Sequence, residues 1–297
     1  MIFLKKPIFS GACTAIITPM KDGRIDYHAL DKLIEFQISE GISAITVAGT
    51  TGENASLSYH EHKQLIKHTA KRIDGRIPVI AGTGSNDTEK AVKMSQYACE
   101  YGADALLGVT PYYHKTNKDG LLAHYQRISD VSTKPIIVYN VPGRTNVNIT
   151  PETYEKLKKI KNIGGIKEAG TNLSDIALTI QKCPEIPLYC GNDDLLLPCL
   201  AVGATGIISV MANIFPAVTS TICRHFLDGD RETAVSLYRK YLNFSRILFA
   251  DVNPIPIKYI MSYANFCKED IRLPLIKADC NLKEKLEAEY ERLINQK

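Results

Sequence analysis

Tryptophan is absent from this chain of 297 residues, and its large aromatic side chains are 15 Tyr and 8 Phe. No apolar run approaches the length of about 20 residues that a membrane-spanning helix needs, so we expect no membrane-embedded part. The apolar start Met1-Ile2-Phe3-Leu4 is followed by Lys5 and Lys6, whereas a secretory signal carries its positive charge before the apolar stretch. The sequence therefore predicts a cytoplasmic protein.

The chain also lacks a strong excess of charge of either sign. Its 36 Lys and Arg and 32 Asp and Glu leave a net charge of +4, and the two signs alternate along the sequence. A nucleic-acid-binding protein usually gathers its basic residues in a patch or stripe, so we predict no nucleic-acid partner. Hydrophobic residues make up 45% of the chain and charged residues 23%, a balance typical of globular proteins.

Metal-binding motifs are missing as well. None of the eight cysteines belongs to a Cys-x-x-Cys pair, which argues against a structural zinc site. His60 and His62 are two residues apart and would point to opposite sides of a helix. Most of the cysteines lie in apolar segments, and cytoplasmic proteins keep their thiols reduced. We predict free thiols and neither a metal ion nor a cofactor.

Short apolar, β-branched runs alternate with longer amphipathic stretches throughout the chain. Poor alternation within each run is typical of strands that are buried on both faces. The runs are Cys13–Thr18, Ser43–Val47, Pro78–Ala81, Ala105–Val109, Pro135–Tyr139, Ile163–Lys167, Leu188–Cys190 and Gly206–Val210. Eight strand–helix units in series favour an α/β fold, a closed (β/α)8 TIM barrel with a C-terminal helical appendage, over an open doubly wound sheet. We expect the barrel over residues 1–228 and the helical region, packed on the barrel, over residues 229–297.

Helix boundaries between these runs are marked by capping residues. Ser58 with Glu61, and Asn86 with Glu89, have the spacing of an N-cap and its capping glutamate. Thr150-Pro151 places a cap before a proline in the first helical position. Left-handed glycines are predicted to end three helices, at Gly41, Gly75 and Gly102. In the C-terminal region, helices are expected around Arg231–Leu248, Pro256–Phe266 and Leu282–Asn295.

A lysine closes the sixth predicted strand, where a barrel of this kind builds its active site. Partial desolvation of Lys167 would favour its neutral amine, a nucleophile that converts a ketone into a Schiff base. An ion pair with Glu168 is the structural alternative. Tyr139 ends the neighbouring strand and can transfer protons beside Lys167, although a packed aromatic ring is the simpler interpretation of an isolated tyrosine.

Three further segments follow the ends of predicted strands. Arg144 lies in a glycine-containing loop and can grip a carboxylate with its fork of donors, unless it is an ordinary surface arginine. The segment Gly49–Glu53 surrounds two threonines with glycines, so its amide and hydroxyl groups can hold an anion. Tyr112 and Tyr113 stand together in a loop, which is typical of an interface or a lid.

Together these motifs resemble one known family. In chain order they read Gly49-Thr50-Thr51-Gly52-Glu53, Thr110-Pro111-Tyr112-Tyr113, Tyr139-Asn140-Val141-Pro142-Gly143-Arg144-Thr145 and Gly165-Ile166-Lys167-Glu168. With them the chain resembles the dihydrodipicolinate synthase family of pyruvate-dependent class I aldolases. The stretch Asn253-Pro254-Ile255-Pro256-Ile257-Lys258 extends the resemblance over essentially the whole chain.

The resemblance implies a set of catalytic roles. Lys167 would form the Schiff base with pyruvate, and Tyr139 would transfer protons while that bond forms. Thr51 and Tyr113 would complete a hydrogen-bonded relay with Tyr139, and Thr50 would help to place the substrate. Family members receive the relay's loop tyrosine from a neighbouring subunit. The resemblance therefore implies that Tyr113 crosses a tight dimer interface, within a homotetramer that is a dimer of dimers.

The second substrate implied by the resemblance is L-aspartate-4-semialdehyde. Arg144 would hold its carboxylate, while Ile208 would line the pyruvate pocket through its backbone, with Gly191 nearby. The implied reaction is a lyase-type condensation and cyclisation in diaminopimelate and lysine biosynthesis.

Other functions remain open at this point. N-acetylneuraminate lyases and 2-keto-3-deoxy sugar-acid aldolases share the barrel and the lysine, but they typically carry Ser-Thr in the glycine loop and lack the Pro-Gly-Arg motif. Thr50 and Arg144 therefore favour the synthase. A non-catalytic barrel that senses a small acid would leave Lys167 and Tyr139 without a purpose. A metal- or phosphate-dependent barrel enzyme lacks its motifs, because the turn Gly82–Ser85 is too generic.

One departure from the family concerns feedback inhibition by lysine. Lysine-sensitive members bind lysine with a histidine after the glycine loop and a glutamate on the third helix. This chain has Tyr59 and Lys90 at those positions. Three other residues of that lysine site, Asn86, His62 and Tyr112, match the family. Two like charges near 4 Å cost about 4 kcal/mol at an effective dielectric of 20. A millimolar ligand has only about 4 kcal/mol of binding free energy. We therefore expect weak or absent inhibition by lysine.

Overall fold

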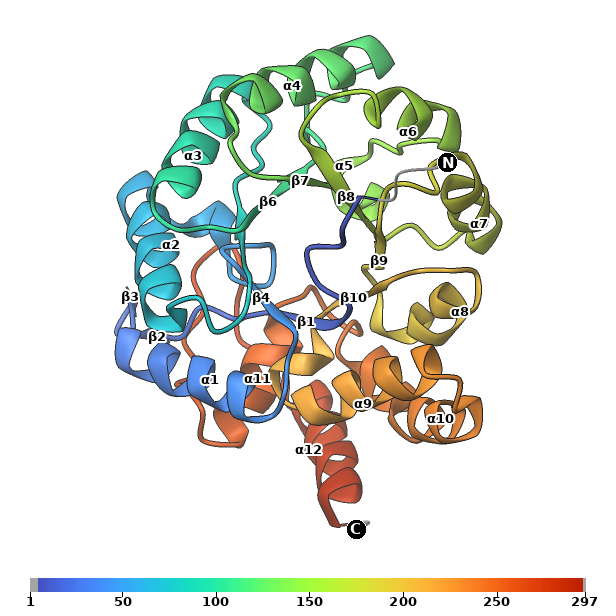
Figure 1. Cartoon of the computed structure of the whole chain (residues 1–297). Coiled ribbons are helices and arrows are strands. Elements are labelled where there is room, and N and C mark those ends of the chain that lie inside the picture. Colours follow the sequence, from blue (N-terminus) through green and yellow to red (C-terminus); the bar gives the residue numbers. More distant parts are fainter. Residues whose placement is uncertain (1–4, 296–297) are drawn as a thin grey trace.

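Eight parallel strands form a closed barrel at the centre of the computed structural model, which describes residues 5–295 (Figure 1). Neighbouring strands follow chain order around the ring, and β10 pairs with β1 to close it. The strands are β1 Gly11–Ala15, β4 Ala44–Val47, β5 Val79–Gly82, β6 Ala105–Val109, β7 Ile136–Asn140, β8 Ile163–Glu168, β9 Leu188–Cys190 and β10 Gly206–Ser209. Each overlaps one of the eight predicted runs, so the predicted (β/α)8 barrel is confirmed.

Helices surround the barrel in the order expected of alternating units (Figure 1). The outer ring consists of α1 Tyr27–Ser39, α2 Tyr59–Ile73, α3 Thr88–Glu100, α4 Lys118–Val131, α6 Pro151–Leu157, α7 Leu173–Lys182, α8 Leu196–Ala201 and α9 Pro216–Leu227. Short elements interrupt the connections: α5 Pro142–Thr145, the 3-10 turns η1 Asn54–Ser56, η2 Asp193–Leu195 and η3 Met211–Asn213, and an antiparallel hairpin of β2 Met20–Lys21 and β3 Arg24–Ile25. Sequence periodicity did not predict the hairpin, because two-residue strands have no period to detect.

The predicted helix caps are confirmed except at one position. Ser58 and Glu61 form a capping box at the start of α2, and the Thr150 side chain caps α6 ahead of Pro151. The prediction of Asn86 as the cap of α3 was wrong, because Asp87 accepts hydrogen bonds from the amides of Glu89 and Lys90. A carboxylate is favoured over an amide at the positive end of a helix dipole, which accounts for the helix starting one residue later.

The predicted left-handed glycines are also found. Gly41, Gly75 and Gly102 have φ of +77°, +71° and +95°. Each lies one residue after a C-cap, where an orphan carbonyl needs a partner and a side chain would be strained.

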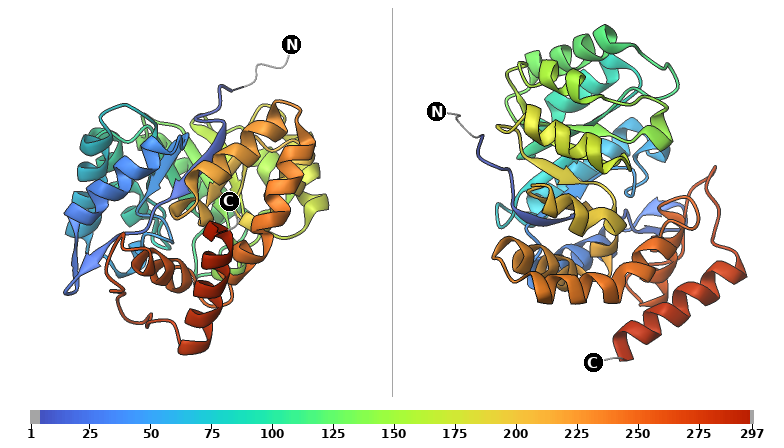
Figure 2. Two further views of the ribbon diagram at one scale, coloured as in Figure 1. Left: turned by 90° about the horizontal axis from the view of Figure 1, so that it is seen from below. Right: turned by 90° about the vertical axis from the view of Figure 1, so that its right-hand side faces the viewer.

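Three helices after residue 228 lie together on one side of the barrel, as Figure 2 shows, with α12 projecting from it. They are α10 Arg231–Ile247, α11 Ile255–Tyr263 and α12 Cys280–Asn295. Phe215, just before α9, packs against α10 and α12: its ring centroid lies 5.1 Å from that of Tyr241, 5.2 Å from Phe244 and 5.8 Å from Tyr290. The predicted helices are thus present and packed on the barrel, while a domain boundary at residue 228 stays a prediction.

Two hydrophobic layers stabilise this arrangement. One lies between the barrel and its helices, and a smaller one fills the barrel interior and includes Ile80, Ile137, Tyr189 and Ile208. Tyr189 stacks on Phe9 with 4.2 Å between ring centroids and donates its hydroxyl to the Phe9 carbonyl. Since Phe9 precedes the first strand, this stack fills the amino-terminal end of the barrel and leaves the carboxyl-terminal end for a site.

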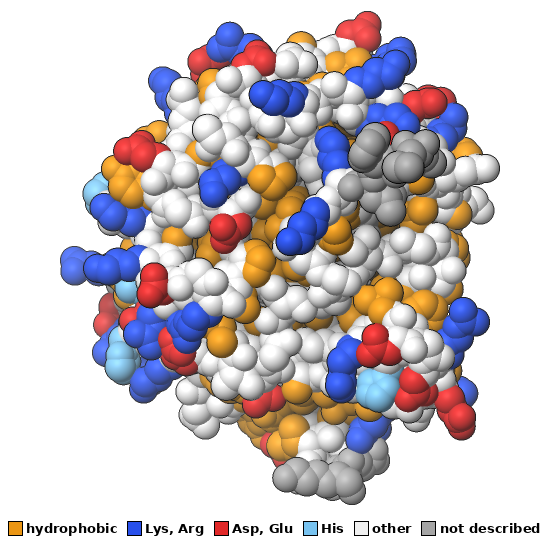
Figure 3. All heavy atoms as spheres, in the orientation of Figure 1, with side chains coloured by type: hydrophobic (Ala, Val, Ile, Leu, Met, Phe, Trp, Pro, Cys, Tyr) orange, Lys and Arg blue, Asp and Glu red, His pale blue; other side chains and the backbone are white. Residues whose placement is uncertain are grey.

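Charged groups of both signs are mixed around the face shown in Figure 3. No helix within residues 5–295 is long and apolar enough to cross a membrane. The eight cysteines are free thiols, as predicted; five are buried, whereas Cys99 and Cys267 are partly exposed and Cys280 is exposed. In the same described range, no group of three or more His, Cys, Asp or Glu side chains is placed to hold a metal ion.

Candidate active site

Lys167 and Tyr139 lie side by side inside the barrel. They are partners in the register of β8 and β7, and Lys167 Nζ is 4.3 Å from the centroid of the Tyr139 ring. Both residues are 6% exposed. The amine of Lys167 is therefore largely shielded from water. The structure thus brings together the two residues that the sequence placed at neighbouring strand ends.

Glu168 points to the other side of β8 and does not pair with Lys167. Its carboxylate accepts hydrogen bonds from Asn140 Nδ2 at 2.9 Å, from the Tyr154 hydroxyl at 2.8 Å and from the Gly170 amide at 2.7 Å. Burial raises the pKa of Glu168, and these donors oppose that shift. The ion pair considered as the alternative for Lys167 is therefore wrong, because successive strand residues face opposite sides.

The connection from β4 to α2 carries Thr50 and Thr51 to the same end of the barrel. Two non-glycine residues with left-handed backbone bracket the threonines: Ala48 has φ of +53° and Glu53 has φ of +57°. Gly82 permits this path, because a Cβ atom there would lie 2.1 Å from the Ala48 carbonyl oxygen. Thr51 is 3% exposed, whereas Thr50 is more accessible.

A cavity of about 50 Å³ opens among these side chains. Six of the predicted site residues line it, together with residues from the barrel strands and from the segment after α10. The lining residues are Ala15, Thr46, Gly49, Thr50, Thr51, Leu107, Tyr139, Val141, Arg144, Lys167, Ala169, Gly191, Asn192, Val210, Phe249 and Asn253. The amine, the phenol, two threonine hydroxyls and a guanidinium thus surround one small space.

Two predicted site residues do not line the cavity. Ile208 is fully buried in the barrel interior, and Val210 takes the lining position two residues later. Tyr113 is 87% exposed on the β6–α4 loop, with a left-handed φ of +69°. Its ring meets that of His114 edge-on, with 6.3 Å between the centroids, and most of its surface faces solvent.

Asn253 is a site residue that the sequence did not assign. Its Nδ2 donates to Thr51 Oγ1 at 3.0 Å, and its carbonyl accepts from Arg144 Nη2 at 2.8 Å. The residue is 5% exposed and connects both sides of the cavity through a contact that spans 202 residues of sequence. Its only sequence signal is its place in the Asn-Pro-x-Pro-x-Lys stretch, which gives no information about what it touches.

Comparison with known proteins decides the family. The profile of the Dihydrodipicolinate synthetase family matches residues 8–293. The chain belongs to the dihydrodipicolinate synthetase family. The resemblance predicted from the four motifs is therefore confirmed.

Individual relatives of this family match over nearly the full length. The chain is 47% identical over 273 residues to the 4-hydroxy-tetrahydrodipicolinate synthase of Acetivibrio thermocellus, covering 92% of this chain and 93% of the relative. The structure of the synthase from Methylacidiphilum fumariolicum SolV superposes with a TM-score of 0.95 at 38% identity, covering 96% of each chain. A chloride-inhibited synthase from Acinetobacter baumannii, solved in complex with pyruvate, has a TM-score of 0.94 at 39% identity and covers 96% of this chain and 98% of its own.

Buried ionisable groups of the barrel surround the lysine of this family member. Burial raises the pKa of Asp193, while Ser209, the amides of Met211 and Val210 and the charge of Lys167 act in the opposite direction. Burial raises the pKa of Cys13 to about 12, so its thiol stays protonated at neutral pH. Asp193 is thus a buried carboxyl group close enough to Lys167 for their charges to interact.

A second cavity, of about 510 Å³, lies between α2 and α3. It contains all five residues that the sequence associated with a lysine site, together with a second cation, Lys93: these five are Tyr59, His62, Asn86, Lys90 and Tyr112. Burial lowers the pKa of His62, whose Nε2 lies 2.7 Å from the Gly82 carbonyl oxygen. Two lysines and no carboxylate line this cavity among the described residues.

Proposed function

We propose that this chain is a lyase that condenses pyruvate with L-aspartate-4-semialdehyde and cyclises the product, as a 4-hydroxy-tetrahydrodipicolinate synthase of diaminopimelate and lysine biosynthesis. One observation carries the proposal: a desolvated lysine, Lys167, lies against Tyr139 in the cavity of a barrel that belongs to this family. The proposed location is the cytoplasm, where both substrates are metabolites.

The first half-reaction uses the amine and the phenol. Lys167 Nζ attacks the carbonyl carbon of pyruvate, water leaves, and the iminium loses a methyl proton to become an enamine. Tyr139, whose ring lies 4.3 Å from Nζ, is in reach to transfer the protons that these steps require. Thr51 is proposed to relay them, and Thr50 to place the substrate.

The second half-reaction depends on the aldehyde substrate. The enamine carbon attacks the aldehyde, and the substrate's own amine then displaces Lys167 by transimination and closes the ring. Arg144 is proposed to bind the carboxylate of the semialdehyde, because its guanidinium lines the cavity with four N–H donors to spare after its bond to Asn253. Gly191 and the backbone of Ile208 are proposed to border the pyruvate subsite.

A neighbouring subunit is part of the proposed site. Tyr113 completes the relay only if another chain supplies it, since it does not line the cavity of its own chain. Its exposure supports a position in an interface, and the proposed assembly is a homotetramer built as a dimer of dimers.

Trapping the Schiff base tests this function. The protein is incubated with pyruvate and reduced with borohydride, and intact and peptide masses are measured. The expected result is one reduced pyruvate adduct on Lys167 and none in Lys167→Ala. An unmodified protein that gives no adduct, or gives one on another lysine, contradicts the mechanism.

Steady-state kinetics then identify the aldehyde partner. Semialdehyde is expected to be consumed with pyruvate, and N-acetylneuraminate to be left uncleaved. Cleavage of N-acetylneuraminate with no condensation activity would assign the chain to the lyases of that sugar.

A further inference from the structure

Glu53 ends the threonine loop with a fully buried carboxylate. Its Oε1 is 2.5 Å from Lys258 Nζ on α11, and the exposed fractions of the two side chains are 1% and 2%. Its Oε2 accepts from the Arg272 amide at 3.2 Å. Lys258 Nζ also donates to the Asp270 carbonyl at 2.5 Å. The last part of the chain therefore holds the end of an active-site loop through buried charges.

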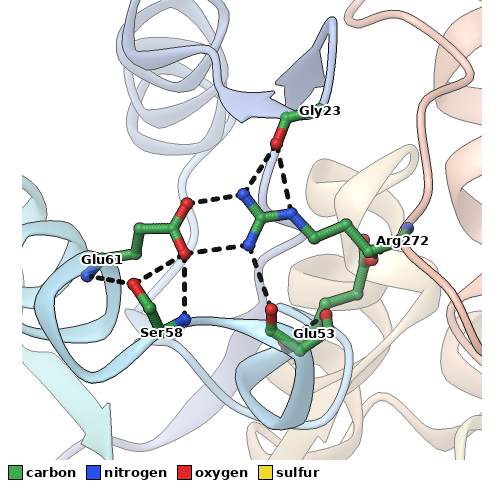
Figure 4. Close-up of polar contacts among 6 residues, drawn as sticks. Gly23, Glu53, Ser58, Glu61 and Arg272 are labelled. Carbon is green, nitrogen blue, oxygen red and sulfur yellow. Dashed lines mark hydrogen bonds and ion pairs between the residues drawn. The ribbon is translucent and has the colours of Figure 1, made fainter.

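Arg272 binds the same loop from the outside. Figure 4 shows its guanidinium between the Gly23 carbonyl and the Glu61 carboxylate, next to the loop that carries Glu53. It also donates to the Ser56 carbonyl at 3.0 Å. Arg272 thus joins the segment that follows the threonines, the start of α2 and the β2–β3 hairpin.

The threonine loop needs external support because its own backbone is strained. Ala48 and Glu53 both have left-handed φ, a conformation that non-glycine residues hold only where surrounding contacts impose it. Few bonds within the loop oppose this strain: the Gly52 amide donates to the Gly49 carbonyl, and the Glu53 amide donates to the Thr50 carbonyl. The Asn54 amide also donates to the Gly49 carbonyl, and Thr18 Oγ1 donates to the Gly52 carbonyl at 2.7 Å. The Glu53 side chain adds the ion pair that joins the loop to the C-terminal region.

The segment just before α11 reaches the reactive end of the loop. Asn253, five residues before Lys258, donates to Thr51 Oγ1 at 3.0 Å. Its own Oδ1 is buried without a hydrogen-bond partner among the described residues. Residues 253–258 therefore touch the loop at both Thr51 and Glu53, so a change at the ion pair is expected to shift the threonine hydroxyl relative to Tyr139.

A buried ion pair is a poor device for stability alone. Desolvation of two charges offsets most of their attraction, and an apolar pair of similar size is often as stable. The charges add a fixed geometry. The Lys258 ammonium also binds the Asp270 carbonyl, and the Glu53 carboxylate also binds the Arg272 amide, so the two groups fit together in one orientation.

We propose that Glu53 and Lys258 are positioning residues for the proton relay. Through the loop and α11 they hold the Thr51 hydroxyl where it serves Tyr139, and neither touches the substrate. The inference rests on the proposed function, because it assigns Thr51 to proton transfer.

A double-mutant cycle separates positioning from stability. The variants are Glu53→Gln, Lys258→Met and the double variant, with Lys283→Met as the control. Lys283 forms a partly exposed ion pair with Glu269 at 2.8 Å in the same helical region. For each protein we would measure Tm, kcat, the KM of pyruvate and the rate of formation of the borohydride-trapped adduct.

Each single substitution strands a buried charge and is expected to lower Tm, whereas the double variant removes both charges and is expected to recover most of the loss. Its kcat and its rate of adduct formation are nevertheless expected to stay about tenfold below those of the unmodified protein, with a KM for pyruvate changed less than about threefold. The control is expected to keep its kcat.

A double variant whose kcat returns to within about fivefold of the unmodified protein would overturn the proposal. If the double variant is too unstable to assay, the nearly isosteric Glu53→Gln is used alone. The proposal then predicts the same result, a lower kcat with a nearly unchanged KM for pyruvate. Failure of the unmodified protein to trap pyruvate would count against the proposed function instead, so the two failures are distinguishable.

Discussion

Lys90 stands where the resemblance predicts a glutamate in lysine-sensitive relatives. Its ammonium group lines the cavity between α2 and α3, 4.0 Å from Asp87 Oδ2, and its side chain is 73% exposed. Lys93 adds a second cation to the same walls, and Tyr59 stands where a histidine was expected. No carboxylate among the described residues lines this cavity to pair with the α-amino group of a lysine ligand.

We predict from this site that free L-lysine inhibits weakly or not at all. The ammonium groups of Lys90 and of a lysine ligand would repel each other. Solvent reduces this repulsion because the Lys90 side chain is exposed, but the interaction stays unfavourable. In a steady-state assay, 1 mM lysine is expected to leave more than half of the activity, about the limit set by millimolar affinity. Half-inhibition by a sub-millimolar concentration would contradict the prediction, and Lys90→Glu serves as the variant in which sensitivity is expected to rise.

Individual residues also mark how far a sequence can predict a site. Lys167, Tyr139, Thr50, Thr51 and Arg144 were predicted because each lies at or just after the end of a recognisable strand, and strand ends meet at one edge of a barrel. Gly191 was predicted only from the resemblance to the family. Asn253 was missed because its contact with Thr51 spans 202 residues and depends on how α11 packs. The cap of α3 was placed at Asn86, but Asp87 forms it. Both residue types can cap a helix, and only the more favourable interaction of a carboxylate with the helix dipole distinguishes them.

At the level of elements, the strands were predictable and the attachment of the C-terminal helices was not. Fully buried parallel strands have an apolar signature that turns interrupt at regular intervals. The bonds of Arg272 to α2 and to the β2–β3 hairpin join segments that no periodic pattern relates. These bonds are polar, so the hydrophobic periodicity that located the helices carries no information about them.

The Arg272–Glu61 pair is expected to make stability depend on acidity. The guanidinium, with support from Ser58, lowers the pKa of Glu61 to about 2. A carboxyl whose pKa is lower in the folded than in the unfolded chain stabilises the fold above its unfolded value of about 4.3, and the contribution disappears as the pH falls towards 2. The stabilisation is thus complete at neutral pH and lost in acid.

Thermal unfolding of Arg272→Met tests this expectation. At pH 7 we predict a Tm lower by about 2–4 °C, the shift that 1 kcal/mol produces in a chain of roughly this size. The difference from the unmodified protein is predicted to shrink between pH 4.5 and pH 2, following the titration of Glu61. Arg272→Lys, which keeps the charge and loses the fork, is expected to lie between the two. A deficit that stays constant across this pH range would argue against the pair as its source.

For the whole molecule, the decisive question is whether one chain contains a complete site. Tyr113 lies outside the cavity of its own chain and is 87% exposed. The (β/α)8 architecture follows from local signals repeated along the sequence, whereas the pairing of subunits depends on surface shape, which leaves no periodic trace. The dimer and the tetramer therefore remain predictions.

Mixing two inactive variants tests the shared site. Lys167→Ala and Tyr113→Phe are each expected to be nearly inactive, but in a mixed dimer the Tyr113→Phe chain keeps its lysine and receives an intact tyrosine. Random exchange in a symmetric dimer gives half mixed pairs with one working site of two, so about a quarter of the normal activity is expected. A mixture no more active than its two components would show that Tyr113 does not act across the interface.

The anchoring of Thr51 by Asn253 has a consequence for the making of the protein. On a ribosome the lysine, the tyrosine and the threonine loop all emerge well before residue 253, yet the loop meets its partner only after that residue has been synthesised. A nascent chain that stops after the eighth strand already carries its nucleophile but lacks the contacts that orient the relay. Catalytic competence thus arrives late in translation, and prematurely terminated copies are expected to contribute no product.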